Sequence, residues 1–187
     1  MKEIEILVTL KDTIEDAKKA LSEFEYQGAK HTLDIYFYDP LRENLKLNSD
    51  NKILECCRIR TKNNINYITY KIDVYDGDTW SHSDEYETQV EDADALLHVF
   101  NALGLKELVR IDNTKHTYIN DTYEIVVEDV RDLGCFLEVE LLNTPDDIDV
   151  TQAKNDILSF IKDLGLDVGE ELNSGKPELM LIKNKQQ

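Results

Sequence analysis

Hydrophobic and polar residues alternate along the chain from Glu3 to Leu10. The aliphatic residues at every second position are Ile4, Ile6, Val8 and Leu10. Glu3 and Glu5 share the other parity. A period of two is typical of a β-strand with one apolar and one polar face. The pattern therefore predicts an opening strand that carries two carboxylates on the same face.

Three later stretches change to helical spacing, with apolar residues three or four positions apart. Asp12 followed by Glu15 resembles a capping box, and a first helical face follows it: Ile14, Ala17, Leu21 and Phe24. A second helical face is formed by Ala93, Leu96, Leu97, Phe100 and Leu103. A third helix is predicted over 150–164. Each of the three is followed by a glycine that can end it: Gly28, Gly104 and Gly165.

The remaining periodic segments are short, alternating and rich in Tyr, Ile, Thr and Val, which favours strands. They cover 32–38, 56–62, 65–75, 84–90, 109–118, 123–129 and 136–141. Turn residues such as Asn63–Asn64 and Asp76–Asp78 separate them, so antiparallel hairpins are expected. About eight antiparallel strands with polar faces turned inward favour a barrel over a sandwich. We expect an α+β fold: an eight-stranded antiparallel β-barrel with helices packed outside.

The chain of 187 residues is long enough to bury a core without disulfide or metal staples. We expect a single domain over residues 1–183 and a C-terminal tail over 184–187. Three cysteines, two of them adjacent, are more typical of reduced thiols than of a disulfide framework. No stretch approaches the roughly 20 apolar residues that span a bilayer, so a cytoplasmic protein is expected. The pattern leaves open whether it is a monomer or a homodimer.

Acidic residues outnumber basic ones by 39 to 21, which gives a formal net charge of −18. Such a charge repels polyanions at long range, so we expect neither a nucleic-acid partner nor an anionic membrane surface. Any anion that this protein binds must be held by a local cluster of basic residues.

Such a cluster is present on the polar faces of the predicted strands. Their charged residues are Glu3, Glu5, Arg58, Arg60, Lys62, Lys71, Glu85, Glu87, Lys115, Glu138 and Glu140. Paired carboxylates suit Mg²⁺ or Mn²⁺, whereas guanidinium and ammonium groups suit phosphate oxygens. A metal-bound polyphosphate would use both sets at once. The alternative is that these residues decorate solvated sheet faces and pair across strands.

Several motifs resemble the CYTH domain, the triphosphate tunnel metalloenzymes, over roughly 2–183. They are the opening Glu-x-Glu, LDIYFYDP, CRIR, ITYK, DEYE and above all DVRDLGCFLEVE. Class IV adenylate cyclases and thiamine-triphosphatase-like proteins are the most similar members. The resemblance implies an eight-stranded antiparallel tunnel and a cofactor of Mg²⁺ or Mn²⁺.

The resemblance also implies roles for individual residues. The metal ligands would be Glu3, Glu5, Glu138 and Glu140, with Glu85 and Glu87 in the acidic wall. The triphosphate would be bound by Arg58, Arg60, Lys71 and Lys115, with Lys183 or Lys176 reaching in from the C-terminal segment. The catalytic residues would be Glu5, Lys71 and Asp129.

Two positions depart from the family pattern. Leu7 stands where the opening motif has lysine, and Asn113 stands where a second basic residue is expected. The resemblance thus leaves three functions open. The first is a class IV-like adenylate cyclase that converts ATP to cyclic AMP and pyrophosphate. The second is a triphosphatase acting on thiamine triphosphate or inorganic triphosphate, and the third is a non-catalytic module that binds a phosphorylated ligand.

Overall fold

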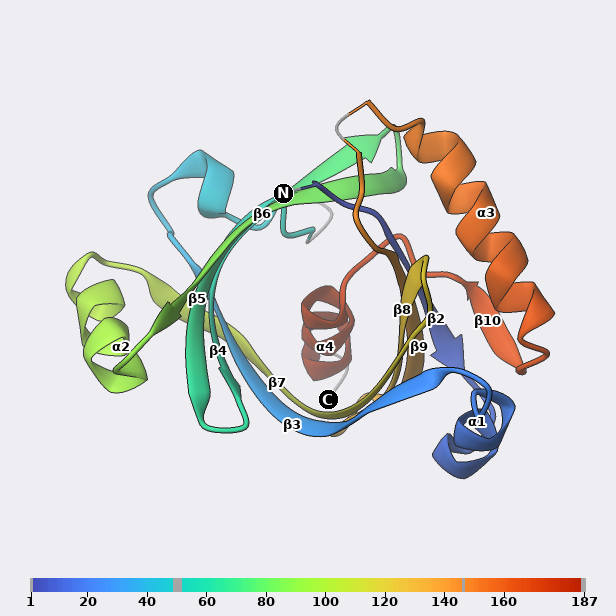
Figure 1. Ribbon diagram of the computed structural model, residues 1–187. Coiled ribbons are helices and arrows are strands. Elements are labelled where there is room, and N and C mark those ends of the chain that lie inside the picture. Colours follow the sequence, from blue (N-terminus) through green and yellow to red (C-terminus); the bar gives the residue numbers. More distant parts are fainter. Residues whose placement is uncertain (1, 49–51, 146, 186–187) are drawn as a thin grey trace.

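The computed structural model describes residues 2–48, 52–145 and 147–185 (Figure 1). The strands are β1 (Lys2–Glu3), β2 (Glu5–Leu10), β3 (Glu25–Tyr38), β4 (Glu55–Lys62), β5 (Ile65–Asp76), β6 (Thr79–Val90), β7 (Lys106–Ile119), β8 (Tyr123–Val130), β9 (Gly134–Leu141) and β10 (Val168–Glu171). The helices are α1 (Ile14–Ala20), α2 (Ala93–Ala102), α3 (Val150–Asp163), α4 (Lys176–Lys185) and the short 3₁₀ helix η1 (Glu43–Leu45).

One antiparallel sheet contains all ten strands, in the order β1-β6-β5-β4-β3-β7-β8-β9-β2-β10. β1 and β2 follow each other in the chain, yet β1 pairs with β6 and β2 pairs with β9. The sheet therefore curls round until its two ends meet at the first strand, as Figure 1 shows. β10 pairs with the second half of β2 and covers the rest of that seam. The predicted antiparallel tunnel is confirmed. β1 and β2 together occupy one of its eight strand positions.

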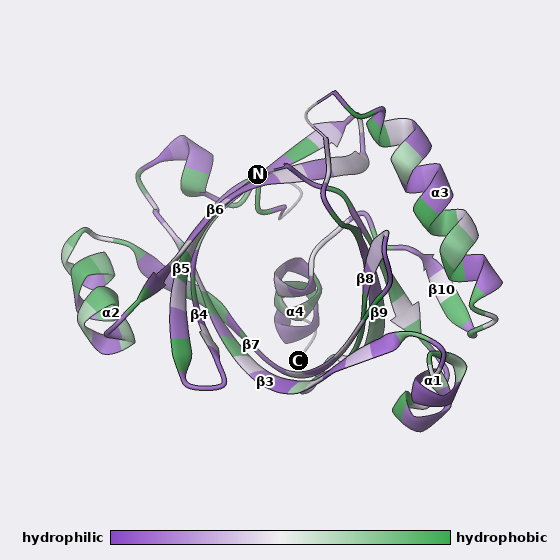
Figure 2. Ribbon diagram, viewed as in Figure 1, coloured by the Kyte–Doolittle hydropathy of each residue, from purple (hydrophilic) through white to green (hydrophobic). Residues whose placement is uncertain are grey.

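The outer face of one side of the tunnel packs against α1 and α3. Ile4 and Ile6, from the opening alternation, are fully buried there together with Leu21 beside α1 and Ile157 of α3. Figure 2 shows the same alternation of hydrophilic and hydrophobic residues along the strands. The aliphatic parity of the first strand thus faces outward, which leaves its glutamates facing the interior.

The opposite side of the tunnel is covered by α2. The ring of Phe100 meets that of Phe37 edge-on, with centroids 5.0 Å apart, and Ile59 and Leu105 complete this small core. Asp92 caps the helix by accepting a hydrogen bond from the backbone N–H of Ala95. The predicted second helix is confirmed with its apolar face toward the sheet.

The structure corrects the start and the end of the first predicted helix. Thr13, not Asp12, is the N-cap, because its hydroxyl accepts the N–H of Asp16. The helix ends at Ala20, and β3 begins at Glu25, before Gly28. β3 pairs with β7 along nearly its whole length, and this long-range pairing outweighs the local helical spacing.

The fourth helix contradicts the expectation that all helices pack outside. α4 lies within the curve of the sheet in Figure 1, and the apolar side chains on this helix pack against the inward-facing side chains of the strands. The resulting cluster, which we call the tunnel floor, contains Leu7, Tyr36, Ile53, Cys56, Val109, Ile111, Val130, Phe136 and Met180. Positions 184 and 185 of the expected tail belong to this helix, and 186–187 lie outside the described residues. Among the described residues, no helix is long and apolar enough to cross a membrane.

Candidate functional site

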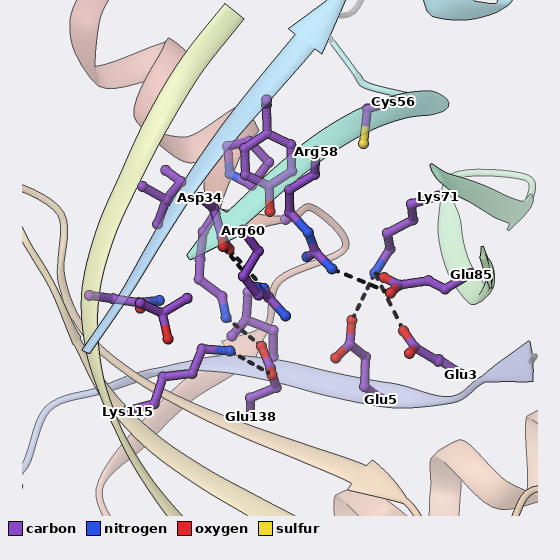
Figure 3. Close-up of a pocket in the computed structure, with 18 of the residues that line it drawn as sticks. Glu3, Glu5, Asp34, Cys56, Arg58, Arg60, Lys71, Glu85, Lys115 and Glu138 are labelled. Carbon is purple, nitrogen blue, oxygen red and sulfur yellow. Dashed lines mark hydrogen bonds and ion pairs between the residues drawn. The ribbon is translucent and has the colours of Figure 1, made fainter. Parts of the chain in front are cut away.

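The half of the tunnel that α4 leaves free is a cavity lined by charged side chains (Figure 3). Its lining includes nine of the site residues predicted from the sequence: Glu3, Glu5, Arg58, Arg60, Lys71, Glu85, Lys115, Glu138 and Glu140. Strand alternation places them there, because each occupies the polar parity of its strand. Segments that are distant in the sequence thus bring carboxylates and cations into one space.

Lys71 lies at the centre of a first group of carboxylates. Its Nζ is 3.0 Å from Glu85 Oε1, 3.5 Å from Glu5 Oε1 and 3.9 Å from Glu3 Oε2. Burial alone would lower the pKa of Lys71, but the charges of Glu5 and Glu85 raise that pKa well above its usual value. The ammonium group is therefore charged and holds the three carboxylates together, as Figure 3 shows.

These carboxylates outnumber the cation that they share. Burial, together with the neighbouring charge of Glu85, raises the pKa of Glu3 far above the usual glutamate value. Glu140 pairs with Glu5 across β2 and β9, and burial and the charges of Glu5 and Glu138 raise the pKa of Glu140 to about 8. Crowded carboxyl groups of this kind bind protons when no other cation is present.

The opposite wall is built around two arginines of β4. Arg60 Nε and Nη2 each donate to the carboxylate of Asp34 at 2.7 Å, a bidentate pair. Burial alone would raise the pKa of Asp34, but the charge of Arg60 lowers that pKa to about 2. Arg58 donates to Thr69 Oγ1 and lies 3.4 Å from Glu85 Oε2. Both guanidinium groups face the cavity, and the carboxylates beside them balance their charge.

A second mixed cluster lies between β7, β8 and β9. Lys115 Nζ is 3.6 Å from Glu138 Oε1 and 3.9 Å from Glu128 Oε2. Lys176, the first residue of α4, donates to both of these glutamates. Asn113 also donates to Glu128 Oε2, at 2.8 Å. Two ammonium groups and two carboxylates thus balance each other at this end of the cavity.

Three predicted site residues lie elsewhere. Asp129 is exposed and lies outside the cavity lining, because Glu128 occupies the inward parity of β8. Glu87 lies outside the cavity lining and accepts a hydrogen bond from Thr69 Oγ1 at 2.8 Å. Lys183 also lies outside the cavity lining, and its Nζ donates to the backbone oxygen of Asp132.

Other charged residues of the site were not predicted as such. Asp34 shares the inward parity of β3 with Thr32 and Tyr36, so strand alternation could have identified it. Glu128 could have been found by the same rule, one position before Asp129. Glu178 could not, because α4 reaches the cavity only through tertiary packing.

The donor set fits a hard divalent cation in its chemistry. Glu3, Glu5 and Glu140 offer carboxylate oxygens, and their pKa values are raised by burial first and by the charges of neighbouring glutamates after it. In the described parts of the chain, however, no three such ligands converge on one point, and Lys71 occupies the space among Glu3, Glu5 and Glu85. Side-chain rotations would be needed to bring these oxygens onto a shared cation.

Comparisons with known proteins agree with this architecture. The curated protein "Putative adenylate cyclase MJ0240" of Methanocaldococcus jannaschii is 31% identical over 143 residues, which is 75% of this chain and 77% of that protein. The PH1819 protein of Pyrococcus horikoshii OT3 superposes with a TM-score of 0.80 at 26% identity, covering 97% of this chain and 99% of that chain.

A more distant structure shares the fold. The "putative adenylyl cyclase" HpAC1 from Hippeastrum, described as having a dominant triphosphatase activity, superposes with a TM-score of 0.64 at 16% identity. It covers 100% of this chain and 97% of that chain. The family model of the CYTH domain matches residues 1–173. Fold, cavity and sequence agree, and the chain belongs to the CYTH domain family.

Proposed function

We propose that this protein is a divalent-cation-dependent enzyme that acts on a triphosphate. The observation that carries the proposal is the division of one cavity between a carboxylate wall around Glu3, Glu5 and Glu140 and a cationic wall around Arg58 and Arg60. A linear triphosphate with its metal ion carries both negative oxygens and a positive centre, so it complements both walls.

The roles of the residues follow from their charges. Arg58, Arg60 and Lys115 would bind the phosphate oxygens and stabilise the negative charge that develops as a P–O bond breaks. Glu3, Glu5 and Glu140 would hold Mg²⁺ or Mn²⁺, with Glu138 beside them. When bound, the ion supplies Lewis-acid polarisation of the phosphates. Lys71 would position Glu5 and Glu85 through the ion pairs described above.

The lining of the cavity favours hydrolysis of inorganic triphosphate. Among the described lining residues, the aromatic rings are those of Tyr36 and Trp80, and both are more than 90% buried. A protein cation already faces each ring, since Lys71 Nζ lies 5.2 Å from the Trp80 ring centroid and Arg58 Cζ lies 6.0 Å from that of Tyr36. The lining thus offers no free ring on which a nucleobase could stack.

The second candidate is cyclisation of ATP, in which the ribose 3′-hydroxyl attacks the α-phosphate and pyrophosphate leaves. The curated relative at 31% identity, which carries an adenylate cyclase name, favours it. The two reactions share the phosphate-binding groups and differ in the attacking oxygen. A product assay therefore separates them more directly than any substitution in the cationic wall.

The test is a product screen with inorganic triphosphate, thiamine triphosphate and ATP, each with Mg²⁺, Mn²⁺ or EDTA. We expect metal-dependent release of orthophosphate from inorganic triphosphate. Cyclic AMP with pyrophosphate from ATP would support the second candidate instead. Binding of a triphosphate without any product would identify a binding module. The absence of both binding and turnover would overturn the proposal.

A further inference from the structure

Two neutral side chains line the charged cavity where β3 pairs with β7. Thr32 and Asn113 are Cα partners in that pairing, and both belong to the cavity lining. Only 1% of Thr32 and 3% of Asn113 is exposed. Among the described residues, neither Thr32 Oγ1 nor Asn113 Oδ1 has a hydrogen-bond partner. Buried polar atoms are seldom left unpaired, so these two oxygens are suited to a ligand or to water.

The amide of Asn113 is oriented by its nitrogen. Asn113 Nδ2 donates to Glu128 Oε2 at 2.8 Å, and Glu128 is fully buried. The reversed amide would place its oxygen against that carboxylate, where two acceptors would repel each other. Asn113 therefore keeps a hydrogen-bond acceptor for the cavity.

Cations from three strands surround this pair. Lys62 of β4 is the Cα partner of Thr32. Lys115 follows Asn113 on the inward face of β7. Burial, and after it the charges of three neighbouring cations with Lys30 of β3 first among them, lower the pKa of Lys62. Cations that repel one another in this way favour an anion beside them, as a bound phosphate would be.

The two oxygens are suited to a water molecule next to that phosphate. Phosphate oxygens carry no hydrogen for Asn113 Oδ1, whereas water can donate one hydrogen to it and the other to Thr32 Oγ1. Directly opposite residues of an antiparallel pair have Cβ atoms about 4.5–5.5 Å apart, a separation that one water molecule can bridge. Both oxygens are covered by neighbouring side chains in this structure. The water would enter as long side chains such as Lys115 turn toward the phosphate.

We propose that Thr32 and Asn113 hold the water molecule that attacks the terminal phosphorus of the triphosphate. The inference rests on the proposed function, because it assigns the attacking group within the same cavity. With both hydrogens donated, the lone pairs of the water face the phosphorus. As the new P–O bond forms, the bond from that phosphorus to the bridging oxygen breaks, and its electron pair leaves with pyrophosphate. Both protons of the water stay on the orthophosphate that is released, so positioning is the main contribution of the protein.

The test measures kcat and KM for inorganic triphosphate with Mg²⁺ in the wild type and four variants. We expect T32V and N113A each to lower kcat about 10-fold, the effect of losing one hydrogen bond in the transition state, with little change in KM. T32S keeps the hydroxyl and should keep most of the activity. T114V is the matched control, because Thr114 is the exposed neighbour of Asn113 on the outer face of β7, and its kcat should not change.

The double variant T32V/N113A examines whether the two residues hold the same water molecule. If they do, its kcat should fall by clearly less than the product of the two single losses, because the second substitution removes a partner from a water that is already displaced. Fully multiplied losses overturn the shared water.

A structural role for the pair predicts a different result. T32V and N113A would then lower the midpoint of thermal unfolding, while kcat stays within about twofold of the wild-type value. That outcome overturns the inference, as does a rise in KM at unchanged kcat. If N113A does not fold because Glu128 loses a donor, T32V decides alone, since it exchanges a hydroxyl for a methyl group and leaves the partners of Glu128 in place.

Failure of the proposed function would look different again. A folded wild-type protein that turns over no triphosphate overturns both proposals together. A wild type that hydrolyses triphosphate, with T32V equally active, overturns only the role of the pair. A wild type whose only product is cyclic AMP also overturns the inference, because a ribose hydroxyl and not water would then be the attacking group.

Discussion

The inward-facing positions of β2, β7 and β9 are charged in one half of the tunnel and apolar in the other. Along β9, Glu140 and Glu138 line the cavity and Phe136 belongs to the tunnel floor. Along β2, Glu5 lines the carboxylate wall and Leu7 packs beneath α4. Both halves obey the same alternation, so the side chains alone divide the tunnel into a binding cavity and a core.

The comparison shows how a barrel with a charged interior is stabilised. Ion pairs between buried groups return little net stability, since desolvation offsets most of the attraction. Apolar burial against α1, α3 and α4 is a more reliable source of stability. The charged half is consequently free to serve a ligand, while the floor and the outer cores hold the strands in position.

The largest effect on stability is expected from a substitution in the tunnel floor. Phe136→Ala removes a ring that is 3% exposed, and we expect the free energy of unfolding to fall by about 3–5 kcal/mol. Urea unfolding followed by circular dichroism measures it. A loss below about 1 kcal/mol would show that α4 does not form a packed core with the strands.

Breaking the charged half should affect activity rather than stability. Glu5→Gln removes one proposed metal ligand, and we expect turnover of the triphosphate substrate to fall about 100-fold or more. Asp129→Asn is the control, because that exposed side chain lies on the outer face of β8, and its turnover should equal that of the wild type. Equal losses in the two variants would contradict the placement of the site inside the tunnel.

Glu178 of α4 lies at the boundary between the charged cavity and the tunnel floor, and its ionisation should make the stability of the protein depend on pH. Burial, together with the charge of Asp73, raises the pKa of Glu178 to about 7, although its backbone partners, including the N–H of Ile53, lower it. Between the unfolded value near 4.5 and about 7 the folded state binds more protons, so this group makes the protein less stable as pH rises. Between pH 5 and 8, we expect the free energy of unfolding of Glu178→Gln to fall by about 1–3 kcal/mol less than that of the wild type.

Denaturant titrations at pH 5, 6, 7 and 8 test this prediction. The wild-type and Glu178→Gln curves should approach each other at pH 5 and separate toward pH 8, with the variant more stable. Parallel curves would show that Glu178 ionises normally and that the floor is open to water.

The smallest effect is expected where neither half of the tunnel is involved. Arg110 donates to both oxygens of Glu107 at 2.8 and 2.7 Å, but the pair is about half exposed. Arg110→Ala should lower the free energy of unfolding by no more than about 0.5 kcal/mol and should leave the Kd of triphosphate unchanged. A change in the Kd would show that this exposed ion pair on the outer surface affects ligand binding, contrary to the prediction.

The comparison with the sequence follows the same division. The alternation around Glu3 and Glu5 predicted which face of β2 lines the tunnel, and the polar parities placed Arg58, Arg60 and Lys71 on the same interior. Side-chain direction in a strand is a local property with a period of two, so a sequence pattern suffices to specify it. Asp129 was chosen from its position in a motif, whereas the parity of its strand places Glu128 on the inward face.

The amino-acid sequence by itself determined the order of eight strands and three helices, the facing of most of the charged residues and the membership of the CYTH family, but not β10 or α4. Only the tertiary structure decided that α4 lies inside the tunnel, that Leu7 belongs to its seat, and that Lys176 rather than Lys183 reaches Glu138. α4 has mixed polarity, and its position depends on apolar surfaces from β2, β7 and β9 that meet only after the sheet has curled. No local pattern encodes such a contact, because its partners lie far apart in the chain.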